Sequence, residues 1–238
     1  GELMSALSNL ADKPVSLMGS GRTDAGVHAT GQVACADMPS SWTPESLQRS
    51  LNAILPPEIW IQSSSIAHPD FHPRYDAIAR TYQYKVGIEP KARSPFYART
   101  CWTLEGQLDY ELLEFGANKL LGEHSFEAFA KSGQPERGYL CIISQAHWSH
   151  SDLGFCFEIT ANRYLHHMVR YLVGTMVDIA RVKRPKDDLQ RLLSAEPDLT
   201  TSPPAPPQGL FLVHVQYPEH FEFPQVPPPA SSKSIANV

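Results

Sequence analysis

The order of strands and helices in the second half of the chain constrains the fold more than any other sequence feature. Its expected elements, in chain order, are a strand at 99–104, a helix at 109–122, strands at 140–150 and 154–162, helices at 164–182 and 186–194, and a strand at 209–217. The strands alternate apolar and polar residues, whereas the helices repeat apolar residues every three or four positions. Apart from one additional short helix, this is the order of the split βαβ, ferredoxin-like unit.

The first half repeats the same unit in incomplete form. Its expected elements are a helix at 2–11, strands at 15–19 and 31–37, a helix at 43–55, and strands at 58–66 and 79–87. Thr43 is the expected N-cap of the second helix, with Pro44 in its first turn. The sequence therefore predicts an α+β protein of two ferredoxin-like halves, residues 1–98 and 99–218, followed by a disordered tail at 219–238.

Composition narrows the function less than the motifs do. The chain has 238 residues and a formal net charge of −5, so binding of nucleic acid would need a local basic surface. Its four cysteines include no Cys-x-x-Cys pair, which predicts reduced thiols rather than a zinc site or a disulfide framework. No apolar run reaches the length of a membrane span. The Pro-rich run at 197–209 is expected to be a surface loop.

A glycine-rich stretch, GSGRTDAGVHATGQV at 19–33, holds the first candidate for chemistry. Its glycines predict a tight turn that exposes its backbone, and Arg22 and Asp24 lie inside it. Asp24 can simply hydrogen-bond to its own turn, as Asp often does in loops. Alternatively, Arg22 or another arginine keeps Asp24 ionised, so that it serves as a nucleophile or a base. The Arg-x-Asp pattern alone does not decide between the two.

Two tyrosines, Tyr82 and Tyr84, share one face of the strand expected at 79–87. Core packing with a solvated hydroxyl is one interpretation of each, and a platform on which a base stacks is the other. The surrounding segment 74–99 favours the second, since it carries six basic residues against two acidic ones. This segment provides the local basic surface that the net charge does not indicate.

The helix expected at 164–182 carries a polar stripe opposite an apolar face. The stripe consists of Arg163, His167, Arg170 and Gly174. His166 and His167 raise the question of a metal site. Adjacent residues of a helix point in different directions, however, and no His-Glu-x-x-His spacing is present, so none is expected. The arginine is better explained as the holder of an anion, either a phosphate or the Asp24 carboxylate.

Five blocks of the sequence resemble the TruA family of tRNA pseudouridine synthases. In the family's order they are GRTDAGVHATGQV, FHPRYDAIARTYQYKV, EHSFEAFA, ANRYLHHMVRYLVG and QGLFLVHVQYP. The resemblance extends from Glu2 to Pro218. It implies two ferredoxin-like halves whose antiparallel sheets join side by side, with the active cleft between them. The family's opening strand has no counterpart in this sequence, so one strand of the first half is expected to be missing.

The resemblance also implies roles for individual residues. The catalytic aspartate falls on Asp24, the arginine that helps to extrude the target nucleotide on Arg22, the tyrosine that stacks on the uracil on Tyr82, and the arginine that pairs with the aspartate on Arg170. Further substrate-binding positions are Gly21, Thr23, His28, Arg80, Asn162, His166 and His167.

The activity that the resemblance implies is isomerisation of uridine to pseudouridine in the anticodon arm of tRNA, at positions 38–40, with no metal and no organic cofactor. It also implies a cytoplasmic homodimer that binds tRNA and has no membrane partner, with organellar targeting left open. One alternative is a protein of the same fold that binds structured RNA, or helps tRNA to fold, without modifying it. Another is an aspartate-dependent phosphoryl-transfer enzyme, which would need a second carboxylate near Asp24 for magnesium. Asp37, the nearest one downstream, lies a whole strand away.

Overall fold

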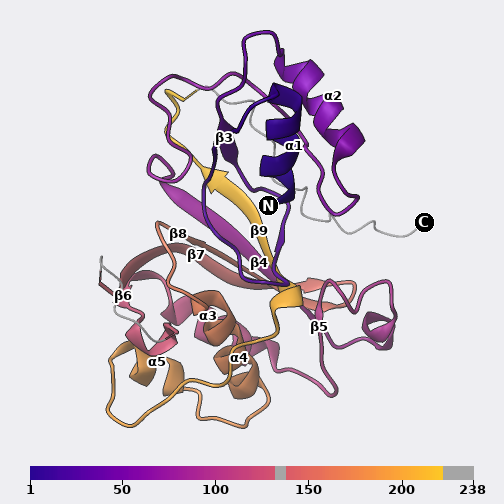
Figure 1. Ribbon diagram of the computed structural model, residues 1–238. Coiled ribbons are helices and arrows are strands. Elements are labelled where there is room, and N and C mark those ends of the chain that lie inside the picture. The colour runs from indigo at the N-terminus through magenta and orange to yellow at the C-terminus, as the bar shows by residue number, and fades with distance from the viewer. Residues whose placement is uncertain (132–137, 222–238) are drawn as a thin grey trace, which may run out of the picture. The chain divides into compact units, whose positions relative to one another are not determined.

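The computed structural model describes residues 1–131 and 138–221, which pack as two compact units (Figure 1). Among the described residues, the smaller unit is formed by Gly1–Gly21, Gln32–Ala77 and residues 217–221, and the larger unit by Arg22–Gly31 and Ile78–Gln216. The glycine-rich stretch is therefore divided, and Asp24 belongs to the larger unit.

The smaller unit pairs two helices with a short sheet. Its elements are α1 (Glu2–Ala11), β1 (Leu17–Gly19), β3 (Ala34–Ala36) and α2 (Pro44–Ile54), with the two strands antiparallel. Thr43 caps α2 as predicted. Its hydroxyl accepts a hydrogen bond from the N–H of Ser46, whose hydroxyl accepts one from the N–H of Thr43 in return. Leu7 of α1 and Leu51 of α2 lie in one buried apolar cluster.

The strand expected at 58–66 is not formed, which corrects the prediction. Side chains of α2 take the place of a strand partner. The Asn52 side chain donates to the Ile61 carbonyl at 2.9 Å and accepts from the Ile61 N–H at 2.7 Å. The Gln48 side chain donates to the Gln62 carbonyl at 2.8 Å. These side-chain amides satisfy backbone groups that would otherwise pair with a neighbouring strand. The segment therefore forms no strand, although its apolar and polar residues alternate as in one.

The larger unit contains a seven-stranded sheet in the order β2-β9-β4-β8-β7-β6, with β5 also paired to β4. Its strands are β2 (His28–Ala29), β4 (Ala79–Gly87), β5 (Trp102–Thr103), β6 (Gly122–Ser125), β7 (Leu140–Ser151), β8 (Gly154–Ala161) and β9 (Leu210–Gln216). The β7–β8 hairpin is formed as predicted. The β2–β9 and β4–β5 pairs are parallel and the others antiparallel. The α+β class with antiparallel sheets is thus confirmed.

Three α-helices lie together against one face of this sheet (Figure 1). They are α3 (Tyr110–Lys119), α4 (Met168–Ala180) and α5 (Asp188–Leu193), and the 3-10 helices of the unit are η1 (Pro90–Arg93), η2 (Glu127–Phe129) and η3 (Pro207–Gly209). Leu172 and Met176 of α4 are fully buried in the same core as Trp148 of β7 and Phe157 of β8. Burial of each such side chain contributes about 1.5–3 kcal/mol, so α4 is firmly placed on the sheet.

The helix predicted at 164–182 begins only at Met168. His167 precedes it with φ 65° and ψ 2°, a left-handed conformation that is uncommon for residues other than glycine. The expected polar stripe therefore does not form one helical face, since Arg163 and His167 lie outside the helix. Leu165, which lies before the helix, is buried and fits the apolar spacing of α4. The predicted helix therefore began too early in the sequence.

The domain boundaries expected after residues 98 and 218 stay predictions. Residues 222–238 of the expected tail lie outside the described residues. Within the residues that are described, no helix combines the length and the apolar character needed to cross a membrane.

Gly174 tests how closely α4 is packed. A Cβ at this position would lie 2.2 Å from the carbonyl oxygen of Pro203, and a backbone atom cannot move aside independently. A glycine-to-alanine change inside a helix ordinarily stabilises it by about 1 kcal/mol. Here we expect Gly174→Ala to lower the free energy of unfolding by about 1–3 kcal/mol, measured by urea denaturation.

The matched control is Gly116→Ala in α3. Its new Cβ would lie 3.1 Å from the side chain of Met176, which is flexible and can shift. This variant should be clearly more stable than Gly174→Ala. Equal stability of the two variants would contradict the close approach of α4 to Pro203.

Candidate active site

Asp24 opens a tight turn in the larger unit. The N–H of Val27 donates to the Asp24 carbonyl at 3.0 Å, and Gly26, the third residue of the turn, has φ +82°, as a type II turn requires. Strand β2 follows directly and pairs with β9. Beyond it, the N–H of Gly31 donates to the Leu212 carbonyl at 3.0 Å. Backbone hydrogen bonds thus fix the loop that carries Asp24 to the sheet.

Three side chains from the beginning of α4 and the residues just before it surround the Asp24 carboxylate. Arg170 Nη1 lies 3.1 Å from Oδ2, and His167 Nε2 lies 3.1 Å from the same oxygen. His166 Nε2 lies 3.3 Å from Oδ1. The Asp24 side chain is only 22% exposed, so its charge is partly removed from water, and the guanidinium compensates it. The structure therefore brings together four of the predicted site residues.

Arg170 is itself held by the Pro-rich segment before β9. Its Nε donates to the Ala205 carbonyl at 2.7 Å, and the N–H of Ala205 donates back to the Arg170 carbonyl at 2.9 Å. The Tyr84 hydroxyl on β4 donates to the next carbonyl, that of Pro206, at 2.7 Å. Ala205 is buried, so this part of the expected surface loop is instead a support for the arginine.

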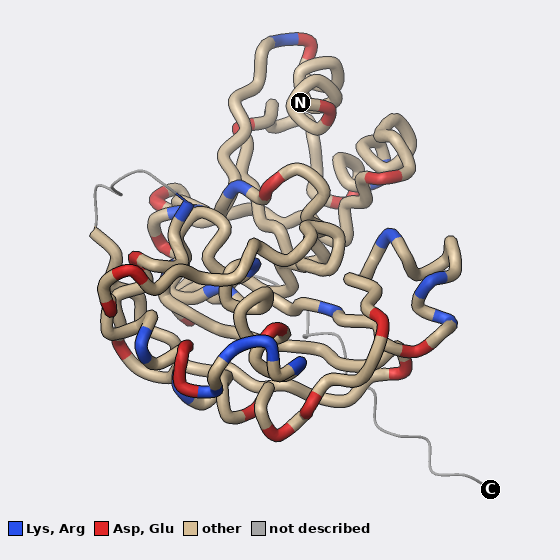
Figure 2. Tube along the Cα trace, turned by 90° about the horizontal axis from the view of Figure 1, so that it is seen from below, with Lys and Arg blue, Asp and Glu red and all other residues tan. Residues whose placement is uncertain are grey.

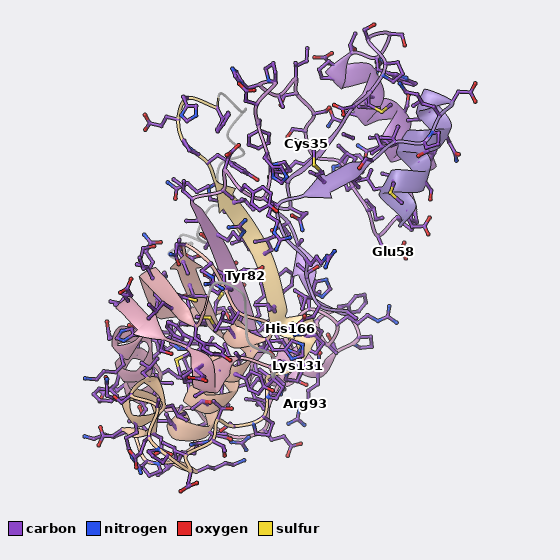
Figure 3. All side chains as sticks on the ribbon, turned by 60° about the vertical axis from the view of Figure 1, so that its left-hand side comes forward. Cys35, Glu58, Tyr82, Arg93, Lys131 and His166 are labelled. Carbon is purple, nitrogen blue, oxygen red and sulfur yellow. The ribbon has the colours of Figure 1, made fainter. Side chains whose placement is uncertain are left out.

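The two histidines reach Asp24 because they precede α4 rather than lie on it. Their ring centroids are 4.2 Å apart, and both Nε2 atoms face the carboxylate. The left-handed backbone of His167 turns the chain here, and the N–H of Lys131 donates to the His166 carbonyl at 3.0 Å. Figure 3 shows His166 and Lys131 on the larger unit. The prediction that the two adjacent rings diverge was wrong, because His166 and His167 precede the helix.

Burial lowers the pKa of His167 from its ordinary value of 6.5, because the imidazolium would lose hydration. The Asp24 carboxylate acts in the opposite direction, while Arg170, His166 and Lys131 lower the pKa of His167 further. The lowered pKa favours the neutral ring, and Nε2 lies within hydrogen-bond distance of Oδ2 of Asp24.

The same carboxylate and imidazoles have the donor set of a metal site. In the described part of the chain, the ligand atoms of Asp24, His166 and His167 lie within 4.8 Å of one another, and two imidazoles with a carboxylate suit zinc. The Arg170 guanidinium contacts one of these carboxylate oxygens, and its positive charge opposes a cation there. Among the described residues no second carboxylate joins the group, so the magnesium site that phosphoryl transfer would need is not formed.

Tyr82 and Tyr84 differ in burial although they share a face of β4. Tyr84 is fully buried in the core, so the stacking platform considered for it is wrong. Tyr82 is only partly covered (labelled in Figure 3), and its ring meets that of Tyr164 edge-on with centroids 4.9 Å apart. Burial raises the pKa of the Tyr82 hydroxyl, Arg80 lowers it and Asp24 raises it.

Two other predicted site residues have partners of their own. His28 stacks on Phe211 with centroids 4.7 Å apart, and its Nε2 lies 2.9 Å from the Arg99 carbonyl oxygen. The Asn162 side-chain oxygen accepts a hydrogen bond from the Ile142 N–H at 2.9 Å and so extends the β7–β8 pairing. Their roles toward a substrate stay predictions.

The remaining predicted residues flank Asp24 or lie on β4. Arg22 is exposed and Thr23 half-buried, directly before Asp24. Gly21 belongs to the smaller unit, where its carbonyl accepts from the Gln32 side chain. Arg80 is half-buried on β4. Their roles toward a substrate are also still predictions.

Two residues that contribute to the site, Ala205 and Lys131, were not among the predicted site residues. Ala205 acts through its backbone, which no residue pattern reveals. Lys131 directly follows the EHSFEAFA block, and this position is the one signal that could have drawn attention to it.

The sequence matches a family of known proteins over most of its length. The sequence model of one family, described as tRNA pseudouridine synthase, matches residues 3–76 and 117–218, which is more than half of the chain. The chain belongs to the tRNA pseudouridine synthase family. This membership favours the isomerase over the RNA-binding protein without catalysis.

Several curated relatives carry the name tRNA pseudouridine synthase A. One from Bacteroides thetaiotaomicron is 36% identical over 220 residues, which cover 91% of this chain and 81% of the relative. One from Histophilus somni is 35% identical over 232 residues, covering 95% and 84%. One from Chlamydia trachomatis is 34% identical over 224 residues, covering 93% and 84%.

The charges around His167 can be tested by NMR titration of its ring protons. We expect a midpoint below 6.5. Asp24→Asn should lower the midpoint further, because it removes the charge that raises the pKa, whereas Lys131→Gln should raise it. Since the unfolded chain then takes up this proton before the folded chain does, stability should fall as the pH drops below 6.5.

Lys183→Gln is the matched control for the lysine variant. Lys183 belongs to the same unit but pairs with Asp178, so this change should leave the His167 midpoint where it is. A midpoint that rises in Asp24→Asn would contradict the assigned arrangement of charges.

Proposed function

We propose that the chain isomerises uridine to pseudouridine in the anticodon arm of tRNA, at positions 38–40, with Asp24 as the reacting carboxylate. The geometry of Asp24 carries this proposal. Its carboxylate stands on a fixed glycine turn with Arg170 and His167 at one oxygen and His166 at the other, in a chain of the tRNA pseudouridine synthase family.

The proposed reaction rearranges the nucleotide without adding or removing atoms. The bond between N1 and the ribose C1′ breaks, the uracil turns, and C5 forms a new bond to C1′. The proton that leaves C5 is balanced by one taken up at N1. No oxidant, reductant or group donor takes part, so the reaction needs no redox cofactor or group carrier.

Asp24 acts on the ribose–uracil unit through Oδ1. Its other oxygen, Oδ2, is held by His167 and Arg170, whose side chains are 16% and 12% exposed. In the described structure Oδ1 contacts His166, which is 57% exposed and can give way to a substrate. Addition of the carboxylate to a ribose carbon and removal of a sugar proton are both open to this oxygen.

Arg22 and Tyr82 prepare the nucleotide for this chemistry. The target base must leave its stack first, at a cost of a few kcal/mol. Arg22 is exposed beside Asp24, so its guanidinium is free to fill the vacated space and contact phosphate. The partly covered ring of Tyr82 then stacks on the uracil while it turns.

The rest of the proposal follows from the family resemblance. Further contacts to the tRNA are made by Gly21, Thr23, His28, Arg80, Asn162, His166 and His167. The protein acts as a cytoplasmic homodimer on tRNA.

The direct test is pseudouridine mapping on an unmodified tRNA transcript incubated with the protein. The wild type should form pseudouridine in the anticodon arm. Asp24→Asn should form none, because the amide cannot act as nucleophile or base, while its affinity for the transcript changes little.

Asp37→Asn is the matched control, since Asp37 is an exposed carboxylate of the smaller unit. It should keep wild-type activity. Product formed by Asp24→Asn would overturn the role of Asp24. Binding of tRNA by the wild type without any product would instead support the RNA-binding alternative.

Tyr82 tests the stacking step. Stacking of a base on an aromatic ring is worth about 1–3 kcal/mol. Tyr82→Leu should therefore reduce single-turnover rates about fivefold to a hundredfold, whereas Tyr82→Phe, which keeps the ring, should stay close to wild type. A large loss in Tyr82→Phe would show that the hydroxyl matters and that stacking is not the main role.

A further inference from the structure

The loop between β4 and β5 exposes an aromatic side chain that the proposed reaction does not use. Phe96 is 88% exposed, more than any other large apolar side chain of the described residues, and Tyr97 beside it is 43% exposed. Segment 89–99 also carries three basic residues, Lys91, Arg93 and Arg99, and one acidic residue, Glu89. Figure 2 shows the Lys and Arg positions of the larger unit in blue.

This loop is a fixed structure, so the exposure of Phe96 is not the result of a loose segment. The N–H of Ala92 donates to the Glu89 carbonyl at 2.9 Å, and that of Tyr97 to the Ser94 carbonyl at 3.0 Å. Ala92 is fully buried, and a Cβ on Gly87 of β4 would lie 2.4 Å from its methyl group. The loop is therefore packed closely onto β4, and its backbone holds Phe96 outward.

The loop is also tied to the catalytic segment. The ring of His28, four positions after Asp24, lies with Nε2 2.9 Å from the carbonyl oxygen of Arg99. The same ring stacks on Phe211 of β9, which fixes its orientation. The loop that carries Phe96 is thus linked, through the His28 side chain, to the segment that carries Asp24.

We propose that Phe96 stacks on an unpaired base of the bound tRNA while Lys91 and Arg99 contact the flanking phosphates. An exposed aromatic ring among basic residues is the chemistry by which proteins hold unpaired nucleotides. Arg93 is paired with Glu105 at 3.1 Å, whereas Lys91 and Arg99 have no ion pair among the described residues. The assignment rests on tRNA being the substrate.

Charge favours RNA over a second copy of the chain as the occupant. A twofold contact through this loop would place the same basic residues opposite one another. Such like-charge contacts are unfavourable, whereas a polyanion neutralises them.

The test is the affinity of the full chain for an unmodified tRNA transcript, measured by fluorescence anisotropy at fixed salt. Phe96→Ala should weaken binding about fivefold to a hundredfold, and Phe96→Trp should restore it. Lys91→Gln should reduce the magnitude of the slope of log affinity against log salt by about 1, as expected for the loss of one phosphate contact. Leu140→Ala removes another exposed apolar side chain of the same unit and should change neither quantity.

In turnover, Phe96→Ala should raise KM and leave kcat nearly unchanged, because the ring does not touch the reacting atoms. Wild-type affinity in Phe96→Ala would overturn the proposal. The proposal would also be overturned if Phe96→Ala changed from dimer to monomer in sedimentation while each subunit kept its affinity for tRNA. That result would show that the loop contacts a second copy of the chain. If Phe96→Ala binds tRNA more weakly but the wild type makes no pseudouridine, the RNA surface stands and the proposed reaction fails.

Discussion

The candidate active site depends on keeping one carboxylate paired while most of it is removed from water. An ion taken from water into a protein interior loses several kcal/mol of hydration, and only close partners compensate for this loss. Asp24 has such partners in Arg170 and two imidazoles. Arg170, whose side chain is less exposed than that of Asp24, has the Ala205 carbonyl as well as the carboxylate. Removing either member of the pair would leave the other as an uncompensated charge, so they act as one unit.

This pair joins parts of the chain that are 146 residues apart, and several segments hold those parts in place. The Asp24 loop is fixed through β2 to β9, and Arg170 is fixed through the buried face of α4. The Pro-rich segment contacts both sides, since a Cβ on Gly26 would lie 3.1 Å from Pro207. Proline restricts the unfolded chain, so this segment loses less entropy when it orders around the ion pair. The Pro-rich composition, which predicted a surface loop, is thus equally suited to a segment that holds Arg170 in place.

The sequence predicted the parts of the fold that follow from local patterns, and the failures are those that need tertiary information. The Thr43 cap, the β7–β8 hairpin and the α+β class follow from capping residues and periodicity. Periodicity failed at 58–66, where side chains of α2 satisfy the backbone in place of a neighbouring strand. It failed again before Met168, because apolar residues outside a helix can be buried with the same spacing. The fate of Tyr84 also depended on what covers β4, which alternation along one strand does not reveal.

The false helix start had a chemical consequence, because it concealed why two adjacent histidines can serve one carboxylate. A left-handed backbone at His167 costs about 1–3 kcal/mol relative to an ordinary conformation, and glycine would avoid most of that cost. The imidazole nevertheless supplies a hydrogen bond to Oδ2 that glycine cannot make. That ring stands next to Arg170, and burial together with this neighbouring charge lowers the pKa of His167, although Asp24 raises it. The packing of α4 against the sheet therefore places Arg170 and the two preceding histidines at Asp24, so the surroundings of this carboxylate depend on a helix from a distant part of the chain.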